Sequence, residues 1–298
     1  MGVAYAILAM LSFASNMLIT RVALTRMPVE AGFLIVLGMN VLFPATLFAV
    51  EITARSEPLV WNWKGAGLYV LAGVVGIFLG RRMLFDTVRL LGAARASVFH
   101  SSAPAFAFLA AWLFAGETTT FTDMALVGVV WIGLWLTQPK SGSQPGLEKM
   151  TPQLLRRGLL LGIGAVAGFG FGNVLRGLAV RSWDEVLFGT ALSSIAALLL
   201  QLAVTRDWPK VMGHFRSAGP SAWLLYAACG VATVCGSIFV TYAMKSIQIG
   251  LAALIVHTTP LVIFPVSAFV LKHREELGAR TLVGAALVLF GIAILVAT

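Results

Sequence analysis

The sequence contains HSSAP at residues 100–104 and HTTP at residues 257–260, two similar motifs whose histidines are 157 residues apart. Each motif lies within a long apolar run and combines a histidine, hydroxyl side chains and a proline. Such residues are unfavourable in hydrocarbon, because proline has no N–H and leaves the carbonyl four residues earlier without its helical donor. One motif alone indicates a kinked helix, whereas its recurrence indicates a polar centre built by two related halves.

The composition is that of a membrane protein. Hydrophobic residues make up 59% of the chain and charged residues 11%, against about 25% charged residues in soluble proteins. The net charge of +9 comes from basic residues between the apolar runs. We interpret this charge as a signal of membrane topology and not of nucleic-acid binding. The expected surroundings are therefore the lipid bilayer, with no nucleic-acid partner.

Apolar windows of about 20 residues predict ten membrane spans. They lie at residues 3–23, 32–51, 65–85, 96–115, 122–138, 158–180, 186–205, 221–244, 249–271 and 281–297. The first run starts at the N-terminus without a basic region or cleavage site, so we expect it to be a retained span.

A polar linker at residues 139–157, rich in proline, glycine and serine, separates an N-terminal repeat at 1–138 from a C-terminal repeat at 158–298. Because each repeat has an odd number of spans, the second must enter the bilayer from the opposite face. We therefore expect an all-α membrane protein, with ten transmembrane helices in two inverted five-helix repeats around a central cavity.

The distribution of positive charge predicts the orientation. Of the 21 Lys and Arg residues, 16 follow odd-numbered spans and five follow even-numbered spans. By the positive-inside rule, the first group faces the cytoplasm. We predict a multi-pass protein of the cell (inner) membrane with both termini outside the cytoplasm.

Superposing the two histidines also superposes Asn16 on Asn173, so both asparagines are candidates for a shared polar site. Arg82, Asp86 and Arg89 share one helix face at the end of the third span. Two guanidiniums around one carboxylate leave positive charge that could hold the carboxylate or phosphate of a substrate. The alternative is an ordinary surface ion pair, worth under about 1 kcal/mol.

Glycines recur at four-residue spacing in the sixth span, and Arg176 continues their face. We interpret the glycines as a packing seam. Arg176 either lines the cavity or reaches the membrane interface. Because few acidic residues lie within the spans, the candidates for coupling to protons are Asp86, His100 and His257.

The candidate substrate-binding residues place polar or aromatic groups within the spans. They are Asn16, Arg82, His100, Ser101, Asn173, Arg176, Tyr242, His257 and Thr258. Pro104 and Pro260 are the predicted hinges. The sequence has no HExxH, CxxC, GxSxG or P-loop motif. We therefore predict that it is not an enzyme, that it has no metal or cofactor, and that it does not use ATP.

Several weak motifs together resemble the EamA branch of the drug/metabolite transporter superfamily over essentially the whole chain. They are the Ala-rich segments at 93–97 and 250–254 ahead of Pro104 and Pro260, the pair Gly116-Glu117, and the final run at 284–291. The pair Arg274-Glu275 departs from the family's Gly-Glu pattern. The resemblance implies an inverted-repeat bundle with alternating access, in a family that moves amino acids, other metabolites, nucleotide sugars and lipid-linked molecules. It also implies cytoplasmic termini for amino-acid exporters, opposite to the charge count.

We therefore expect a secondary transporter for a small metabolite, such as an amino-acid exporter or an organic-anion carrier. The excess of arginine over acidic residues within the spans favours a substrate with a carboxylate or phosphate. One alternative is a flippase or carrier for a phosphorylated or lipid-linked substrate. Another is a membrane protein that does not transport, such as an intramembrane lipid-modifying enzyme. The sequence leaves the oligomeric state open.

Overall fold

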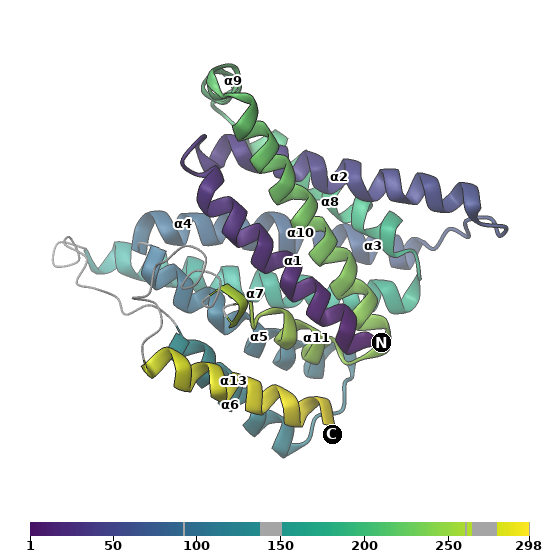
Figure 1. The fold of residues 1–298 in the computed structure, drawn as a ribbon, viewed down its shortest axis with the longest axis vertical. Coiled ribbons are helices and arrows are strands. Elements are labelled where there is room, and N and C mark those ends of the chain that lie inside the picture. The colour runs from purple at the N-terminus through teal and green to yellow at the C-terminus, as the bar shows by residue number, and fades with distance from the viewer. Residues whose placement is uncertain (92, 138–150, 260, 264–278, 298) are drawn as a thin grey trace. The chain divides into compact units, whose positions relative to one another are not determined.

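The computed structural model describes residues 1–91, 93–137, 151–259, 261–263 and 279–297 (Figure 1). These residues form helices and their connections, and no strand occurs among them. The helices are α1 (Gly2–Ala23), α2 (Val29–Ala54), α3 (Trp63–Ala72), the π-helix η1 (Gly73–Gly80), α4 (Arg81–Leu91), α5 (Ala93–Ala115), α6 (Phe121–Thr137), α7 (Pro152–Ser182), α8 (Val186–Val204), α9 (Trp208–Ser217), α10 (Pro220–Ser246), α11 (Ile249–Val256) and α13 (Ala279–Ala297).

Seven helical segments in the described part of the chain are long and apolar enough to cross a membrane. They are Gly2–Ala23, Val29–Ala54, Trp63–Leu91, Pro152–Ser182, Val186–Val204, Pro220–Ser246 and Ala279–Val296. The other three predicted spans overlap the shorter apolar helices Ser102–Ala115 and Phe121–Thr137 and the helix α11. The all-helical membrane fold is therefore confirmed, and the number of ten spans stays a prediction.

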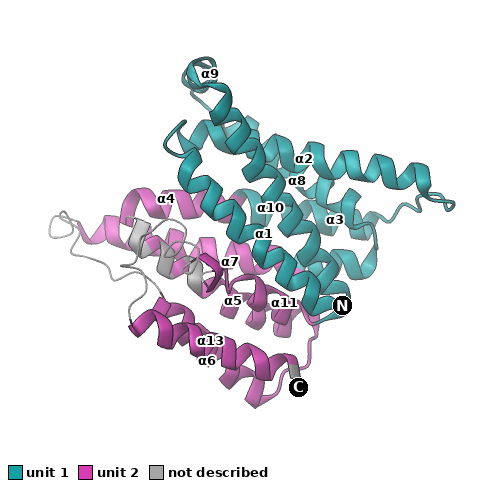
Figure 2. Ribbon diagram, viewed as in Figure 1, with its two compact units in different colours: residues 1–78, 175–247 teal, residues 79–174, 248–298 magenta. Residues whose placement is uncertain are grey.

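The chain forms two compact units (Figure 2). Unit 1 contains Met1–Phe78 and Leu175–Ile247, and unit 2 contains Leu79–Val174 and Gln248–Thr298. Each unit combines helices from the first and the second part of the chain. Because this grouping follows contacts and not sequence similarity, the predicted repeats at 1–138 and 158–298 stay a prediction.

Inside the units, several helices pack against the helix that holds the same place in the other predicted repeat. In unit 1, α2 packs on α8, which correspond to predicted spans two and seven. In unit 2, α5 packs on α11 and α6 packs on α13, which correspond to spans four and nine, and five and ten. Such pairing is expected if the two halves are related by a two-fold axis.

Glycines allow the close helix packing in unit 2. A Cβ atom added at Gly158, Gly162 or Gly164 of α7 would come within 2.5 to 2.7 Å of a neighbouring side chain. The neighbours are Leu91, Phe99 and Met83, respectively. These contacts confirm the predicted packing seam in the sixth span. Each glycine removes the side chain that would otherwise hold the helices apart.

The third predicted span, residues 65–85, contains a π-helix that the sequence pattern did not predict. Gly73–Gly80 follows α3 and leads directly into α4. Gly73 lies against the backbone of Ser193 in α8, where a Cβ atom would collide with the Ser193 carbonyl. The π-helix therefore begins at a close backbone contact with α8. Single π-helical turns are rare and often occur near functional sites.

Candidate functional site

The second of the two repeated motifs marks the end of α11 in unit 2. Because residue 260 is proline, the carbonyl of Val256 has no donor four residues later. Thr259 supplies the donors instead, with its N–H 3.4 Å and its Oγ1 2.7 Å from that carbonyl oxygen. Thr258 Oγ1 likewise donates to the carbonyl of Ile255, at 2.6 Å. The α-helix therefore ends at Val256, and residues 257–259 form a turn that satisfies the carbonyls of Ile255 and Val256.

Two of the predicted site residues lie in this turn. His257 is half-buried and directly follows the helix. Thr258 is buried, and its hydroxyl hydrogen is used by the Ile255 carbonyl. The predicted hinge Pro260 lies outside the described residues. In a membrane, such interrupted helices occur where protein or a water-filled cavity lines them.

The first motif lies on α5, which packs against α11 in the same unit. Pro104 is buried inside α5, and the helix continues through it to Ala115. His100 and Ser101 are helical in the same element, but their side chains lie outside the described part. The structure therefore brings the two motif-bearing helices together, although only the second motif ends its helix.

Glu117 fixes the other end of α11. Gly116 has a φ of 66°, a left-handed conformation that glycine adopts without strain. Glu117 follows it and accepts hydrogen bonds from the N–H groups of Ile249 at 2.6 Å and Gly250 at 3.2 Å. A carboxylate at this place satisfies two free donors and complements the helix dipole. The sequence analysis noted the pair Gly116-Glu117 but did not predict this role.

The two superposed asparagines lie in different units. Asn16, on α1 of unit 1, is half-buried, and its Oδ1 accepts a hydrogen bond from Thr20 Oγ1 at 3.3 Å. Thr20 in turn contacts Cys229 Sγ on α10 at 3.3 Å. Asn173 is half-buried on the part of α7 that belongs to unit 2. Both asparagines lie on helices that are long and apolar enough to cross a membrane, and their shared site stays a prediction.

The predicted charged face of the third span lies on α4. Arg82 is exposed, whereas its neighbour Arg81 is half-buried. Asp86 and Arg89 form a loose ion pair with 3.9 Å between Oδ1 and Nη1, and 63% of the Arg89 side chain is exposed. The geometry of this pair is that of a surface contact. Arg82 therefore does not share a buried cluster with Asp86 and Arg89.

The last two predicted site residues lie in unit 1. Arg176 is half-buried on α7. Tyr242, on α10, stacks on Tyr5 of α1 with ring centroids 5.4 Å apart. Lys245 Nζ lies 5.7 Å from the centroid of the Tyr242 ring, a favourable cation–π distance. Tyr242 thus belongs to an aromatic contact between α1 and α10.

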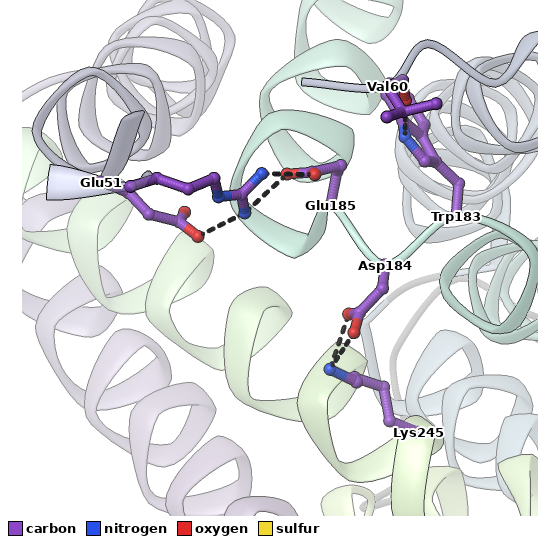
Figure 3. A network of polar contacts seen from close by, with 7 residues as sticks. Glu51, Val60, Trp183, Asp184, Glu185 and Lys245 are labelled. Carbon is purple, nitrogen blue, oxygen red and sulfur yellow. Dashed lines mark hydrogen bonds and ion pairs between the residues drawn. The ribbon is translucent and has the colours of Figure 1, made fainter. Parts of the chain in front are cut away.

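A network of charged side chains, which the sequence did not predict, lies at helix ends in unit 1 (Figure 3). Arg55 donates to Glu185 at 2.6 and 3.2 Å and to Glu51 at 2.8 Å. Lys245 donates to Asp184 at 2.6 Å. The hydrogen bond to Glu185 raises the pKa of Arg55 further above its usual value, so the guanidinium stays charged at any working pH. No sequence motif pointed to the contacts with Glu185 and Asp184, because these residues are 130 and 61 positions away from Arg55 and Lys245.

Aromatic and amide side chains fix the connection between α7 and α8 within this network. Trp183 Nε1 donates to the carbonyl of Val60 at 3.0 Å (Figure 3). Asn62 donates to the carbonyl of Ser182 at 3.0 Å and also caps α3 by accepting from the N–H of Gly65. The segment 182–185 is therefore held to α2, α3 and α10. In the described part of the chain, no group of three or more His, Cys, Asp or Glu residues could hold a metal ion.

Comparisons with known proteins bear on the fold and family. The model of the EamA-like transporter family matches residues 1–138 and 156–297. One solved crystal structure is similar with a TM-score of 0.73 and 17% sequence identity, covering 99% of this chain and 96% of the other. At this identity the likeness concerns the fold alone. No curated protein matches the sequence.

Proposed function

The chain belongs to the EamA-like transporter family, and we propose that it is a secondary transporter that moves a small metabolite by alternating access. Membership of this family indicates a membrane transporter and not an enzyme. The first-choice substrate is an amino acid or an organic anion, which the chain would bind through polar groups inside its spans. We propose the inner membrane as its location.

The observation that best supports transport is the interrupted helix α11 beside α5. The turn at residues 257–259 places His257 at the end of a short helix within an apolar segment. The packed partner α5 contains Pro104 and the corresponding histidine, His100. Secondary transporters commonly build their substrate sites from such discontinuous helices. We propose that both histidines, with Ser101 and Thr258, face the transport pathway during the cycle.

A second candidate is a carrier for a phosphorylated or lipid-linked substrate. The exposed guanidiniums of Arg82 and Arg89 on α4 favour it. Guanidinium groups bind phosphate through paired hydrogen bonds, and exposed ones at the end of a span are accessible to lipid head groups.

Transport by purified protein in proteoliposomes tests the proposal. The panel is a set of labelled amino acids, organic acids, phosphorylated metabolites and short-chain lipid phosphates, measured by counterflow. We expect Asn16→Ala and Asn173→Ala each to reduce the rate about tenfold, the effect of losing one hydrogen bond of about 1.4 kcal/mol. Gln201→Ala is the matched control, because this amide contacts Thr205 at the end of its own helix. Its rate should stay near that of the parent.

Two results would contradict the proposal. If the parent moves no member of the panel although it is folded and correctly inserted, the chain is not a transporter of these compound classes. If both asparagine variants transport at the parent rate, the symmetric polar site is wrong. Movement of lipid phosphates alone would favour the second candidate.

A further inference from the structure

Three polar side chains lie at a similar depth below the charged network in unit 1. Tyr69 on α3 is six residues beyond Trp63, Arg176 is six residues before the end of α7, and Thr190 is four residues beyond the start of α8. At 1.5 Å per residue, each lies about 6 to 9 Å from its helix end. The ring centroids of Tyr69 and Trp183 are 6.4 Å apart, so Tyr69 lies beside the segment 182–185.

Two of these side chains have hydroxyl groups without partners. In the described part of the chain, Tyr69 Oη and Thr190 Oγ1 are the two buried side-chain polar atoms that form no hydrogen bond. Tyr69 is 0% exposed and Thr190 is 4% exposed. The Tyr69 ring also packs against Gly189, the residue before Thr190. Buried hydroxyls without partners are unfavourable, and each such group in a native structure calls for an explanation.

The third side chain has a charge without a counter-ion. Within the described residues, Arg176 makes no ion pair or hydrogen bond, and its charge interacts with the Tyr69 hydroxyl. The acidic residues at the nearby helix ends, Asp184 and Glu185, are paired with Lys245 and Arg55 instead. A charged residue inside a membrane span generally has a partner or a functional role. The three groups therefore offer hydrogen-bond donors and a positive charge, and no acidic partner neutralises them.

We propose that Arg176, Tyr69 and Thr190 form an anion subsite, which binds the carboxylate or phosphate group of the transported molecule. The guanidinium supplies paired N–H donors and the positive charge, and each hydroxyl supplies one O–H donor. A bound oxyanion satisfies both hydroxyls and neutralises the arginine at the same time. This proposal rests on the proposed function and adds Tyr69 and Thr190 to the predicted site.

Three variants test the subsite with minimal change of shape. Tyr69→Phe and Thr190→Val remove the hydroxyls, and Arg176→Gln removes the charge. The matched controls are Tyr226→Phe and Thr241→Val, because these buried hydroxyls already donate to the carbonyls of Met27 and Ser237. The probes are lactate, succinate, glutamate and inorganic phosphate, with lactamide as a neutral control. Thermal stability and direct binding are measured for the purified protein.

We expect the ligand-free Tyr69→Phe and Thr190→Val proteins to melt at or above the parent temperature, because they lose only unpaired hydroxyls. Tyr226→Phe should melt lower, because it leaves the carbonyl of Met27 unpaired. Thr241→Val should melt near the parent temperature, because the carbonyl of Ser237 keeps its helical N–H donor. At least one oxyanion probe, but not lactamide, should stabilise the parent and the controls. Each hydroxyl variant should weaken that binding about tenfold or more, and Arg176→Gln should abolish it. Comparing the carboxylate probes with inorganic phosphate shows which of the two anionic groups the subsite binds.

The subsite would be wrong if Tyr69→Phe and Thr190→Val melted lower than the parent and bound the probes as tightly. The hydroxyls would then have a structural role. A parent protein that no oxyanion probe stabilises also contradicts the subsite. Equal transport by the parent and all three variants would remove the subsite and leave the proposed function intact.

Discussion

Arg55 and Glu185 illustrate how geometry decides the strength of an ion pair. The guanidinium donates to both carboxylate oxygens, and only 11% of the Glu185 side chain is exposed. By contrast, Arg89 and Asp86 are 3.9 Å apart and 63% and 39% exposed. Solvent screening and side-chain entropy make such an exposed pair nearly neutral in stability. The first pair should therefore hold the end of unit 1, and the second should contribute little.

Arg55→Gln and Glu185→Gln should each lower the free energy of unfolding by about 1 to 3 kcal/mol, because each leaves a partly buried charge with fewer partners. The double variant should lose less than the sum of the two. Arg89→Gln should change stability by less than about 0.5 kcal/mol. Unfolding of the detergent-solubilised parent and of these four variants measures the changes in stability. Equal losses for Arg55→Gln and Arg89→Gln would contradict the assignment.

At the residue scale, the sequence could predict which side chains are unusual but not all of their surroundings. Proline at position 260 predicted an unpaired carbonyl, and the structure shows Thr259 satisfying it. Arg82, Asp86 and Arg89 were assigned one helix face from their spacing, and all three lie on the regular helix α4. The spacing could not predict how exposed that face is, and both arginines are exposed. Tyr69 and Thr190 had no signal, because their missing partners are visible only in three dimensions.

At the element scale, the contact between α6 and α13 depends on two glycines facing each other. A Cβ atom at Gly133 would lie 2.8 Å from the carbonyl oxygen of Gly284, and one at Gly284 would lie 2.6 Å from that of Gly133. Around them, Val130, Leu134 and Val288 are at most 1% exposed. Small residues thus bring the two backbones together, and the larger ones fill the space beside them.

Gly133→Ala and Gly128→Ala, both on α6, should therefore have opposite effects. An added methyl at Gly133 would collide with backbone, which cannot move as easily as a side chain, and should destabilise the protein by about 1 to 3 kcal/mol. Gly128 has open space around its Cα, so alanine there should be neutral or stabilise by up to about 1 kcal/mol. The melting temperatures of the two variants, compared with that of the parent, measure these effects. A lower value for Gly128→Ala alone would contradict the described packing.

Sequence periodicity predicted most of the elements, because long apolar runs leave few alternatives to a membrane helix. The helix ends were less accurate: α2 covers Val29–Ala54, whereas the hydropathy window gave 32–51. The short helix α9 was missed, since ten mostly exposed residues in a connection produce no hydropathy signal. Which helices pair within each unit could not be read from the sequence either.

At the scale of the whole molecule, the charge count predicts that both termini are outside the cytoplasm. A reporter that is active only in the cytoplasm should therefore be inactive when fused after Thr298. The same reporter inserted after Ser143, in the predicted cytoplasmic linker, should be active and serves as the positive control. The opposite pattern would place the termini in the cytoplasm, as the family resemblance implied for amino-acid exporters.

The division into units that each combine early and late parts of the chain has a consequence for biosynthesis. When the ribosome has made only the first five spans, the carbonyl of Met27 still lacks Tyr226, and Glu117 still lacks the N–H groups of Ile249 and Gly250. Unit 1 can be completed only when residue 247 has been inserted, and unit 2 only after that. The first half must therefore wait in the membrane for its partner helices, and until then water pairs these two polar groups, which lie in connections between helices.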